Sequence, residues 1–112
     1  MKAYILTKHG KPTVLQQTEI PVPSLGPDQV CVNIECIGLN YAEIMARKGF
    51  YDWAPKMPYT LGMEAYGRIE AIGDGVSARA VGDKVIIGTQ YGCYAEKFVG
   101  HWQTTAPAIE QF

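Results

Sequence analysis

The sequence predicts a mainly β fold, a barrel or a sandwich of short strands, with one or two short helices. Segments in which apolar and polar side chains alternate recur along the chain, and alternation with a period of two is typical of strands. The 12 glycines and 7 prolines separate these segments by turns. Because 112 residues suffice for one hydrophobic core, a single domain over residues 1–112 is expected.

The expected strands follow one another at short intervals. Residues 1–7 and 14–19 form a hairpin around a turn rich in glycine and proline. From Pro21 to Pro27 the chain is a surface loop, since proline cannot continue a helix or a central strand. Further strands are expected at residues 30–37, 66–72, 84–87 and 94–99, whereas residues 101–112 lose the strand pattern.

A strand, a helix and an aromatic loop are predicted in succession at residues 30–61. Alternate side chains of the strand form two faces, one with Val30, Val32, Ile34 and Cys36 and the other with Cys31, Asn33, Glu35 and Ile37, and one of these faces is expected to lie in the core. In the helix, Asn40 can act as the cap, Glu43 lies in the first turn, and Gly49 follows Lys48 as the stop. Residues 50–61 mix aromatic side chains with prolines, which predicts an irregular loop suited to the wall of a pocket.

Composition and charge exclude several classes of function. Ten basic and 11 acidic residues give a formal net charge of -1 without a basic run, so nucleic acid is not an expected partner. No apolar stretch is long enough for a membrane span or a signal peptide, and a cytoplasmic location follows by default. His, Cys and acidic residues show no metal-ligand spacing. Three buried free thiols are therefore expected: Cys31, Cys36 and Cys93.

Residues 73–78 fit the pattern G-x-G-x-x-A of a dinucleotide-binding turn and follow a predicted strand. A dinucleotide site requires this motif to open a helix within a βαβ unit. Here Gly82, Asp83 and a new strand follow almost at once, which leaves no room for that helix. We therefore predict a turn that connects two strands.

Asn40 and Tyr51 are the candidate catalytic residues. An amide at a helix start and a phenol from the aromatic loop can both hydrogen-bond a carbonyl without a metal. From the residue types alone the simpler alternative is favoured, in which Asn40 merely caps the helix and Tyr51 merely packs. Glu64 stands beside apolar residues and is expected to be a buried, hydrogen-bonded structural carboxylate rather than a catalytic acid.

Ordered motifs run over essentially the whole chain: M-K-A-Y, G-P-D-Q-V-C-V, G-L-N-Y-A-E, G-M-E-A-Y-G-R-I-E-A-I-G-D-G-V and V-G-D-K-V. They resemble the amino-terminal, GroES-like domain of the medium-chain dehydrogenase/reductase superfamily, a partly open β-barrel. The chain is most similar to the quinone oxidoreductase branch, which includes zeta-crystallin. Within that branch, N-Y-A-E-I-M-A-R-K-G-F-Y-D resembles the signature of the vesicle amine transport protein group.

The resemblance implies a zinc-free reductase. Zinc alcohol dehydrogenases carry a catalytic cysteine where this chain has Asn40 and a histidine where it has Met63. In the quinone oxidoreductase branch, the residues that match Asn40 and Tyr51 line the cleft near the nicotinamide. Cofactor contacts are therefore expected at Asn40, Tyr41 and Met45, although some members have a cofactor-contacting tyrosine in place of Met45.

The implied reaction is hydride transfer from NADPH to a quinone or an activated enone. Family members continue into a Rossmann cofactor domain, which is expected to be absent from this chain, and residues 106–112 resemble the crossing point. The fragment alone is expected to be inactive, and a homodimer is the assembly considered for the full-length protein. Two alternatives remain: a zinc-free enoyl or alkenal reductase, and a non-catalytic, stand-alone GroES-like binding domain.

Overall fold

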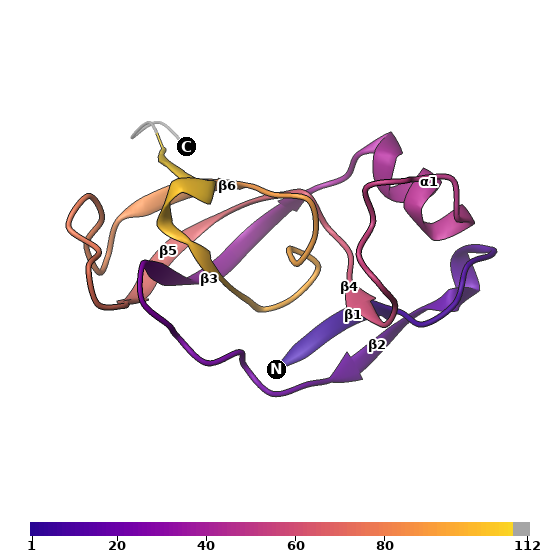
Figure 1. The fold of residues 1–112 in the computed structure, drawn as a ribbon, viewed down its shortest axis with the longest axis horizontal. Coiled ribbons are helices and arrows are strands. Elements are labelled where there is room, and N and C mark those ends of the chain that lie inside the picture. Colours follow the sequence, from indigo (N-terminus) through magenta and orange to yellow (C-terminus); the bar gives the residue numbers. More distant parts are fainter. Residues whose placement is uncertain (109–112) are drawn as a thin grey trace.

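The computed structural model describes residues 1–108, which form two antiparallel sheets and one α-helix (Figure 1). The smaller sheet has the order β2-β1-β4, with β1 at Lys2–Leu6, β2 at Leu15–Glu19 and β4 at Tyr59–Thr60. The larger sheet has the order β7-β3-β5-β6-β8, with the strands β3 (Gln29–Gly38), β5 (Glu64–Ile72), β6 (Lys84–Gly88), β7 (Lys97–His101) and β8 (Thr105–Pro107). The sheets do not close, which confirms the predicted mainly β, partly open barrel.

The larger sheet carries the main hydrophobic core. Along β5, buried side chains alternate with more exposed ones, because a strand turns successive side chains to opposite faces. Ile69 on this strand is only 1% exposed, and side chains of its type stabilise a fold by about 1.5–3 kcal/mol when fully buried. The buried members of the core are Val30, Val32, Ala65, Ile69, Val85, Ile87, Cys93 and Phe98.

β3 follows the predicted alternation only in part. Its register with β5 shifts between Cys31 and Val32 and again between Ile34 and Cys36. A bulge inserts an extra residue and changes which face the following side chains occupy. Val30, Cys31 and Val32 are all buried, whereas Cys36 is exposed. The prediction of buried thiols is therefore wrong for Cys36, whereas it is confirmed for Cys31 and Cys93.

The smaller sheet and the helix share a second core. α1 (Tyr41–Lys48) packs with this sheet around the buried residues Leu6, Ala46, Tyr59 and Leu61. The predicted hairpin is confirmed: β1 pairs with β2, and the 3-10 helix η1 (Pro12–Val14) lies in the connection. Arg47 of α1 donates from Nη1 to the carbonyl oxygen of Gly10 at 2.5 Å. The helix is thus bound to the hairpin turn.

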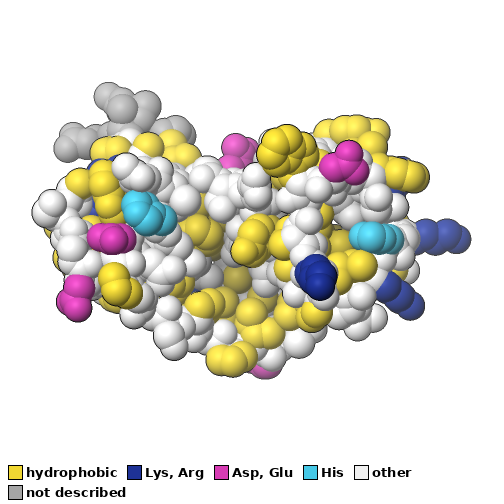
Figure 2. Space-filling model, in the orientation of Figure 1, with side chains coloured by type: hydrophobic (Ala, Val, Ile, Leu, Met, Phe, Trp, Pro, Cys, Tyr) yellow, Lys and Arg dark blue, Asp and Glu magenta, His cyan; other side chains and the backbone are white. Residues whose placement is uncertain are grey.

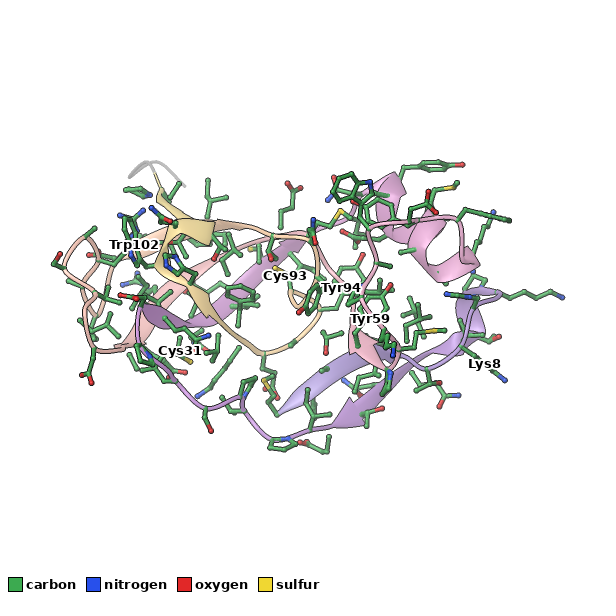
Figure 3. The ribbon with its side chains drawn as sticks, in the orientation of Figure 1. Lys8, Cys31, Tyr59, Cys93, Tyr94 and Trp102 are labelled. Carbon is green, nitrogen blue, oxygen red and sulfur yellow. The ribbon has the colours of Figure 1, made fainter. Side chains whose placement is uncertain are left out.

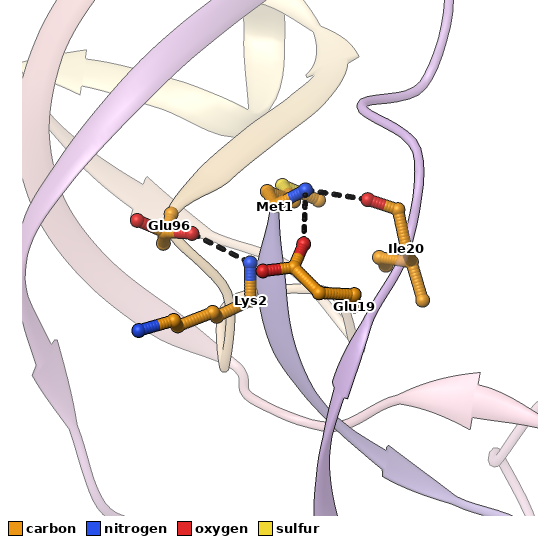
Figure 4. Close-up of polar contacts among 5 residues, drawn as sticks. All are labelled: Met1, Lys2, Glu19, Ile20 and Glu96. Carbon is orange, nitrogen blue, oxygen red and sulfur yellow. Dashed lines mark hydrogen bonds and ion pairs between the residues drawn. The ribbon is translucent and has the colours of Figure 1, made fainter.

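Polar contacts of the first two residues fasten β1 to the end of the hairpin and to the chain before β7 (Figure 4). The Met1 amino group donates to the carbonyl oxygen of Ile20 at 2.6 Å and lies 3.1 Å from Oε2 of Glu19. The backbone N–H of Lys2 donates to Oε1 of Glu96 at 2.5 Å. The Lys2 contact therefore holds β1 beside the chain that leads into β7.

The last described residues contain regular structure that the sequence pattern did not reveal. β7 extends to His101, the 3-10 helix η2 covers Trp102–Thr104, and β8 pairs with β6. The expected loss of strand structure after residue 100 is therefore wrong as far as Pro107. A three-residue strand is too short to show alternation, and its pairing partner is distant in sequence. Of the predicted crossing segment, residues 109–112 lie outside the described part of the chain.

The glycine motif at residues 73–78 is a strand connection, as predicted. The chain forms turns between β5 and β6 and no helix. Gly73 donates its N–H to the carbonyl oxygen of Gln29 at 2.8 Å, and a Cβ at Gly73 would lie 2.1 Å from the carbonyl oxygen of Gly26. Glycine is required here by this close backbone approach.

Replacement of Ile69 by alanine tests the main core. We expect Ile69→Ala to lower the free energy of unfolding by about 2–5 kcal/mol, because it leaves a cavity in a closely packed region. Ile72→Ala, on the same strand but 37% exposed, is the matched control and is expected to cost less than about 1 kcal/mol. Chemical denaturation measures both values, and equal losses would contradict this description of the core.

The thiols are expected to differ sharply in reactivity. Burial raises the pKa of Cys31 to about 11, with the Glu70 carboxylate adding to the effect, and burial raises the pKa of Cys93 to about 12. Because the thiolate is the reactive form, both should resist alkylation at pH 8 in the folded protein, while exposed Cys36 reacts. Iodoacetamide labelling followed by mass spectrometry checks this, with denatured protein as the control. Rapid labelling of a folded Cys36→Ser variant at either remaining thiol would contradict it.

Candidate functional site

The pairing of β3 with β5 brings together the segments that contain Asn40 and Met63. Gly38, at the end of β3, lies opposite Glu64, at the start of β5. The chain passes from Gly38 through Asn40 into α1, and Met63 directly precedes Glu64. The candidate site therefore lies at the end of the larger sheet, where α1 begins.

A buried carboxylate, Glu43, occupies the centre of this region. It lies in the first turn of α1 and is 4% exposed. Its Oε1 accepts hydrogen bonds from the Met63 backbone N–H at 3.2 Å and from Asn40 Nδ2 at 3.3 Å, and its Oε2 accepts one from the Tyr94 hydroxyl. Three donors from three parts of the chain thus converge on one carboxylate, which offsets the cost of burying its charge.

Asn40 holds the N-cap position of α1, but its side chain does not cap the helix. Its backbone is extended, with φ -126° and ψ 149°, and its carbonyl oxygen accepts from the Glu43 N–H at 3.1 Å. Among residues 1–108 its side chain makes one hydrogen bond, the one from Nδ2 to Glu43. The interpretation of Asn40 as a simple side-chain cap is therefore wrong. The second N–H and the oxygen of the amide are available to other groups.

The backbone next to Met63 fits closely against Tyr94. Gly62 has φ 112°, and a Cβ at this position would lie 2.6 Å from the ring of Tyr94 and from its backbone nitrogen. Tyr94 donates its N–H to the carbonyl oxygen of Leu61 at 2.7 Å. Figure 3 shows Tyr94 near Tyr59, in the region between the two sheets. A glycine that accepts positive φ and carries no side chain therefore places Tyr94 within reach of Glu43.

The other predicted site residues lie on α1 and on the aromatic loop. Tyr51 is half-buried and packs against the second core, which Tyr94 also contacts. Tyr41, the first residue of α1, is 71% exposed. Met45 is half-buried, and its carbonyl oxygen accepts from the Phe50 N–H at 2.8 Å. Hydrogen bonds thus join Asn40 to Met63 through Glu43, and packing joins Tyr51 to the same part of the fold.

The structural carboxylate was assigned to the wrong residue. Glu64 is exposed, because the alternation of β5 directs Ala65 into the core and Glu64 away from it. The buried, hydrogen-bonded carboxylate is Glu43. Its position three residues after the cap, in register with buried Ala46 and Arg47 on one helix face, is the local signal that indicates it. Tyr94 carries no such signal, since it reaches the site through tertiary structure alone.

The surface around α1 carries several large, exposed apolar side chains. Figure 2 shows hydrophobic side chains gathered over the region that α1 occupies in Figure 1. Large apolar side chains that remain exposed in clusters mark contact surfaces in most proteins. Those on or beside α1 and on the aromatic loop are Leu39 (77% exposed), Tyr41 (71%), Ile44 (40%), Phe50 (69%) and Trp53 (71%).

A cavity of about 500 Å³ has Tyr59, Lys97, Phe98 and His101 in its wall. None of the predicted site residues lines it. The Tyr59 hydroxyl is buried without a hydrogen-bond partner among the described residues, and burial raises its pKa. Neither Asn40 nor Glu43, which carry the amide and the buried carboxylate of the candidate site, lines this cavity.

Within residues 1–108, no three His, Cys, Asp or Glu side chains form a group that could hold a metal ion. Over the same residues no helix has the length and apolar character that crossing a membrane requires.

Known proteins resemble this chain over its whole length. It is 35% identical to the human protein "Synaptic vesicle membrane protein VAT-1 homolog" over 100% of this chain and 28% of that protein. It is 38% identical to the quinone oxidoreductase of Rattus norvegicus, over 98% of this chain and 34% of the enzyme. The structure of Escherichia coli quinone oxidoreductase complexed with NADPH superposes with a TM-score of 0.94 and 27% identity, covering 100% of this chain and 34% of that one.

The chain spans about a third of the length of these relatives. Residues 26–108 match the family described as "Alcohol dehydrogenase GroES-like domain". That match covers most of the barrel, including β3, α1 and the residues around Glu43. The chain therefore belongs to the alcohol dehydrogenase GroES-like domain family, with the quinone oxidoreductases and the VAT-1 proteins as its relatives.

Proposed function

We propose that this domain forms one wall of the active site of a zinc-independent reductase that transfers hydride from NADPH to a quinone or an activated enone. The observation that carries the proposal is the Asn40 amide, half-buried at the start of α1, with one N–H engaged by Glu43. Its second N–H and its oxygen match the hydrogen-bonding groups of a carbonyl or a carboxamide. The quinone oxidoreductase relatives support the reaction class.

In this proposal Asn40 donates its second N–H to the carbonyl oxygen of the substrate, where negative charge develops. The Tyr51 hydroxyl is the second donor. Donors that are held in place before the reaction stabilise such charge without the cost of reorganisation. NADPH supplies the hydride when it is bound. Tyr41 and Met45, on the same helix as Glu43, are the proposed contacts of this domain with the cofactor.

The dinucleotide is proposed to bind mainly outside residues 1–112, in a Rossmann domain. Residues 73–78 form a strand connection, so the one dinucleotide-like motif of this chain is accounted for by the fold. The exposed apolar surface around α1 supports a covering domain at this position, because apolar area of this kind is normally removed from water by a partner. Residues 1–112 are then a single GroES-like unit of a longer enzyme.

Zinc independence is part of the proposal. Asn40 and Met63 stand where the resemblance to zinc alcohol dehydrogenases places two metal ligands. Here the Asn40 amide is bound to Glu43, and Met63 contributes its backbone N–H to the same carboxylate. Polarisation of the substrate carbonyl is therefore assigned to neutral hydrogen-bond donors.

Composition bears on the partners of the full-length protein. A net charge of -1 argues against a nucleic-acid partner, so the proposed partners are a small quinone or enone and a second copy in a homodimer. The proposed location is the cytoplasm.

An enoyl or alkenal reductase is the alternative within the same architecture. It would use the same hydride donor and the same amide, and would differ in the shape of the substrate cleft. Comparison of NADPH oxidation with a quinone and with an enone, at equal concentrations of full-length enzyme, separates the two assignments.

Substitution of the two proposed donors tests the reaction. In the full-length enzyme we expect Asn40→Ala to lower kcat about 100-fold, and Tyr51→Phe to lower it about tenfold, because each removes a donor from the developing negative charge. Stopped-flow NADPH oxidation with a quinone measures both. Asn33→Ala on β3 and Tyr4→Phe on β1 are matched controls with exposed side chains and should keep the wild-type rate. Wild-type kcat in Asn40→Ala would show that the role of Asn40 is misassigned.

Titration of the 112-residue chain with NADPH tests whether the dinucleotide binds mainly outside these residues. We expect no saturation up to millimolar NADPH in a fluorescence titration, since the residues assigned to this domain contact only the nicotinamide end. The full-length enzyme should saturate in the micromolar range that is usual for enzymes. Micromolar binding by the short chain would contradict the proposal and favour a stand-alone binding domain.

A further inference from the structure

Resting on the proposed function, we propose that Glu43 is a positioning residue for the reaction: its buried carboxylate selects the one orientation of the Asn40 amide that presents a free N–H and the amide oxygen to the reacting carbonyl. Glu43 itself does not touch the substrate. It acts through Asn40, and it joins Asn40 to Met63 and Tyr94.

The selection follows from what a carboxylate can do. An ionised carboxylate only accepts hydrogen bonds, whereas the amide of asparagine has one donating and one accepting end. Only the amino end of Asn40 can therefore face Oε1 of Glu43, and Nδ2 lies 3.3 Å from it. Rotation of the amide by 180° would place its oxygen against the carboxylate and remove the hydrogen bond. The second N–H and the oxygen are thus fixed on the side away from Glu43.

The carboxylate is itself held in place. Glu43 is 4% exposed, and its other two donors come from outside the helix, the Met63 N–H on Oε1 and the Tyr94 hydroxyl on Oε2. A side chain bound at both oxygens cannot rotate without leaving a buried donor unpaired, which costs about 1–3 kcal/mol for each group. The orientation of Asn40 is therefore set by a rigid partner rather than by solvent.

Attachment of α1 to the rest of the fold does not require the bond between Glu43 and Asn40. The bonds to Met63 and Tyr94 suffice to fasten α1 to the connections before β5 and before β7. The bond to Asn40 adds little to that connection, because Asn40 adjoins Glu43 in the chain and is half-buried. The effect of the Asn40–Glu43 bond is to fix the orientation of the Asn40 amide.

The orientation is tested first without any turnover, by NMR of full-length protein labelled with ¹⁵N-asparagine. The side-chain signals of Asn40 are assigned by their loss in Asn40→Ala. The two amide protons of any asparagine differ in chemical shift, because rotation about the C–N bond is slow. We expect this difference, and the ratio of the two exchange rates with water, to be larger for Asn40 than for exposed Asn33, because the proton bonded to Glu43 is shifted downfield and protected. In Glu43→Gln the Asn40 values should approach those of Asn33, since a glutamine amide can donate as well as accept and no longer selects one orientation.

Tyr94→Phe is the companion variant. It removes the bond to Oε2 and leaves the Asn40 bond to Oε1 intact, so it should lower the thermal stability while the enlarged shift difference of Asn40 is retained. If Glu43→Gln does not fold, the comparison of Asn40 with Asn33 in the wild type still decides. Wild-type Asn40 values equal to those of Asn33, or unchanged Asn40 values in a folded Glu43→Gln, overturn the proposal.

A double-mutant cycle then tests the effect on the reaction. We expect Glu43→Gln to lower kcat about tenfold with little change in the KM for the quinone, and to cause no further loss in the Asn40→Ala background, because residues that act as one unit are not additive. Glu35→Gln, an exposed carboxylate on β3, is the matched control and should leave kcat unchanged.

The outcomes separate this inference from the proposed function. Equal losses of kcat from Glu43→Gln in both backgrounds would overturn positioning through Asn40. A wild-type kcat in Asn40→Ala would refute the assigned reaction role of Asn40, while the NMR signals would still decide whether Glu43 orients the amide.

Discussion

The antiparallel pairing of β3 with β5 is the constraint on which the rest of this structure depends. These strands are the two long members of the larger sheet, and their apolar faces supply Val30, Val32, Ala65 and Ile69 to the main core. Their register ends with Gly38 opposite Glu64. Because the register of a strand pair is fixed by which face must be buried, the hydrophobic pattern of the core also decides which residues meet beyond the end of the pair. Those residues are Asn40 and Met63.

The burial of the Glu43 carboxylate organises the site that results. Glu43 lies on the inner face of α1 with Ala46 and Arg47, and each buried polar group on this face has a partner. Arg47 bonds the hairpin turn at Gly10, while Glu43 bonds the chain before β5 and the tyrosine before β7. The helix is short, and its attachment therefore depends on these polar contacts as well as on Ala46. An isolated charge here would destabilise the fold, so stability and the arrangement of the site have the same cause.

The inner and outer sides of α1 differ in what covers them. Its inner side is fastened by hydrogen bonds and by the second core. Its outer side, with the aromatic loop, exposes Tyr41, Phe50 and Trp53. This chain aligns over nearly all of its length but covers only about a third of each relative. The Asn40 amide is bound to Glu43 on one side, while its second N–H and its oxygen are available to a group on the other side.

The sequence by itself determined the class of fold, the hairpin, the helix with its stop at Gly49 and the strand connection at Gly73, because these depend on local periodicity and on glycine and proline geometry. Its motifs also indicated the family, and they singled out Asn40. What only the tertiary structure decided were features that depend on partners far apart in the chain: the bulges that expose Cys36, the short strand β8, and the identity of the buried carboxylate as Glu43 rather than Glu64. Asn40 changed from a helix cap to the partner of Glu43 for the same reason. Its amide orientation is set by a carboxylate whose other donors, Met63 and Tyr94, lie 20 and 51 residues away from Glu43 in the sequence, and no local pattern records such a meeting.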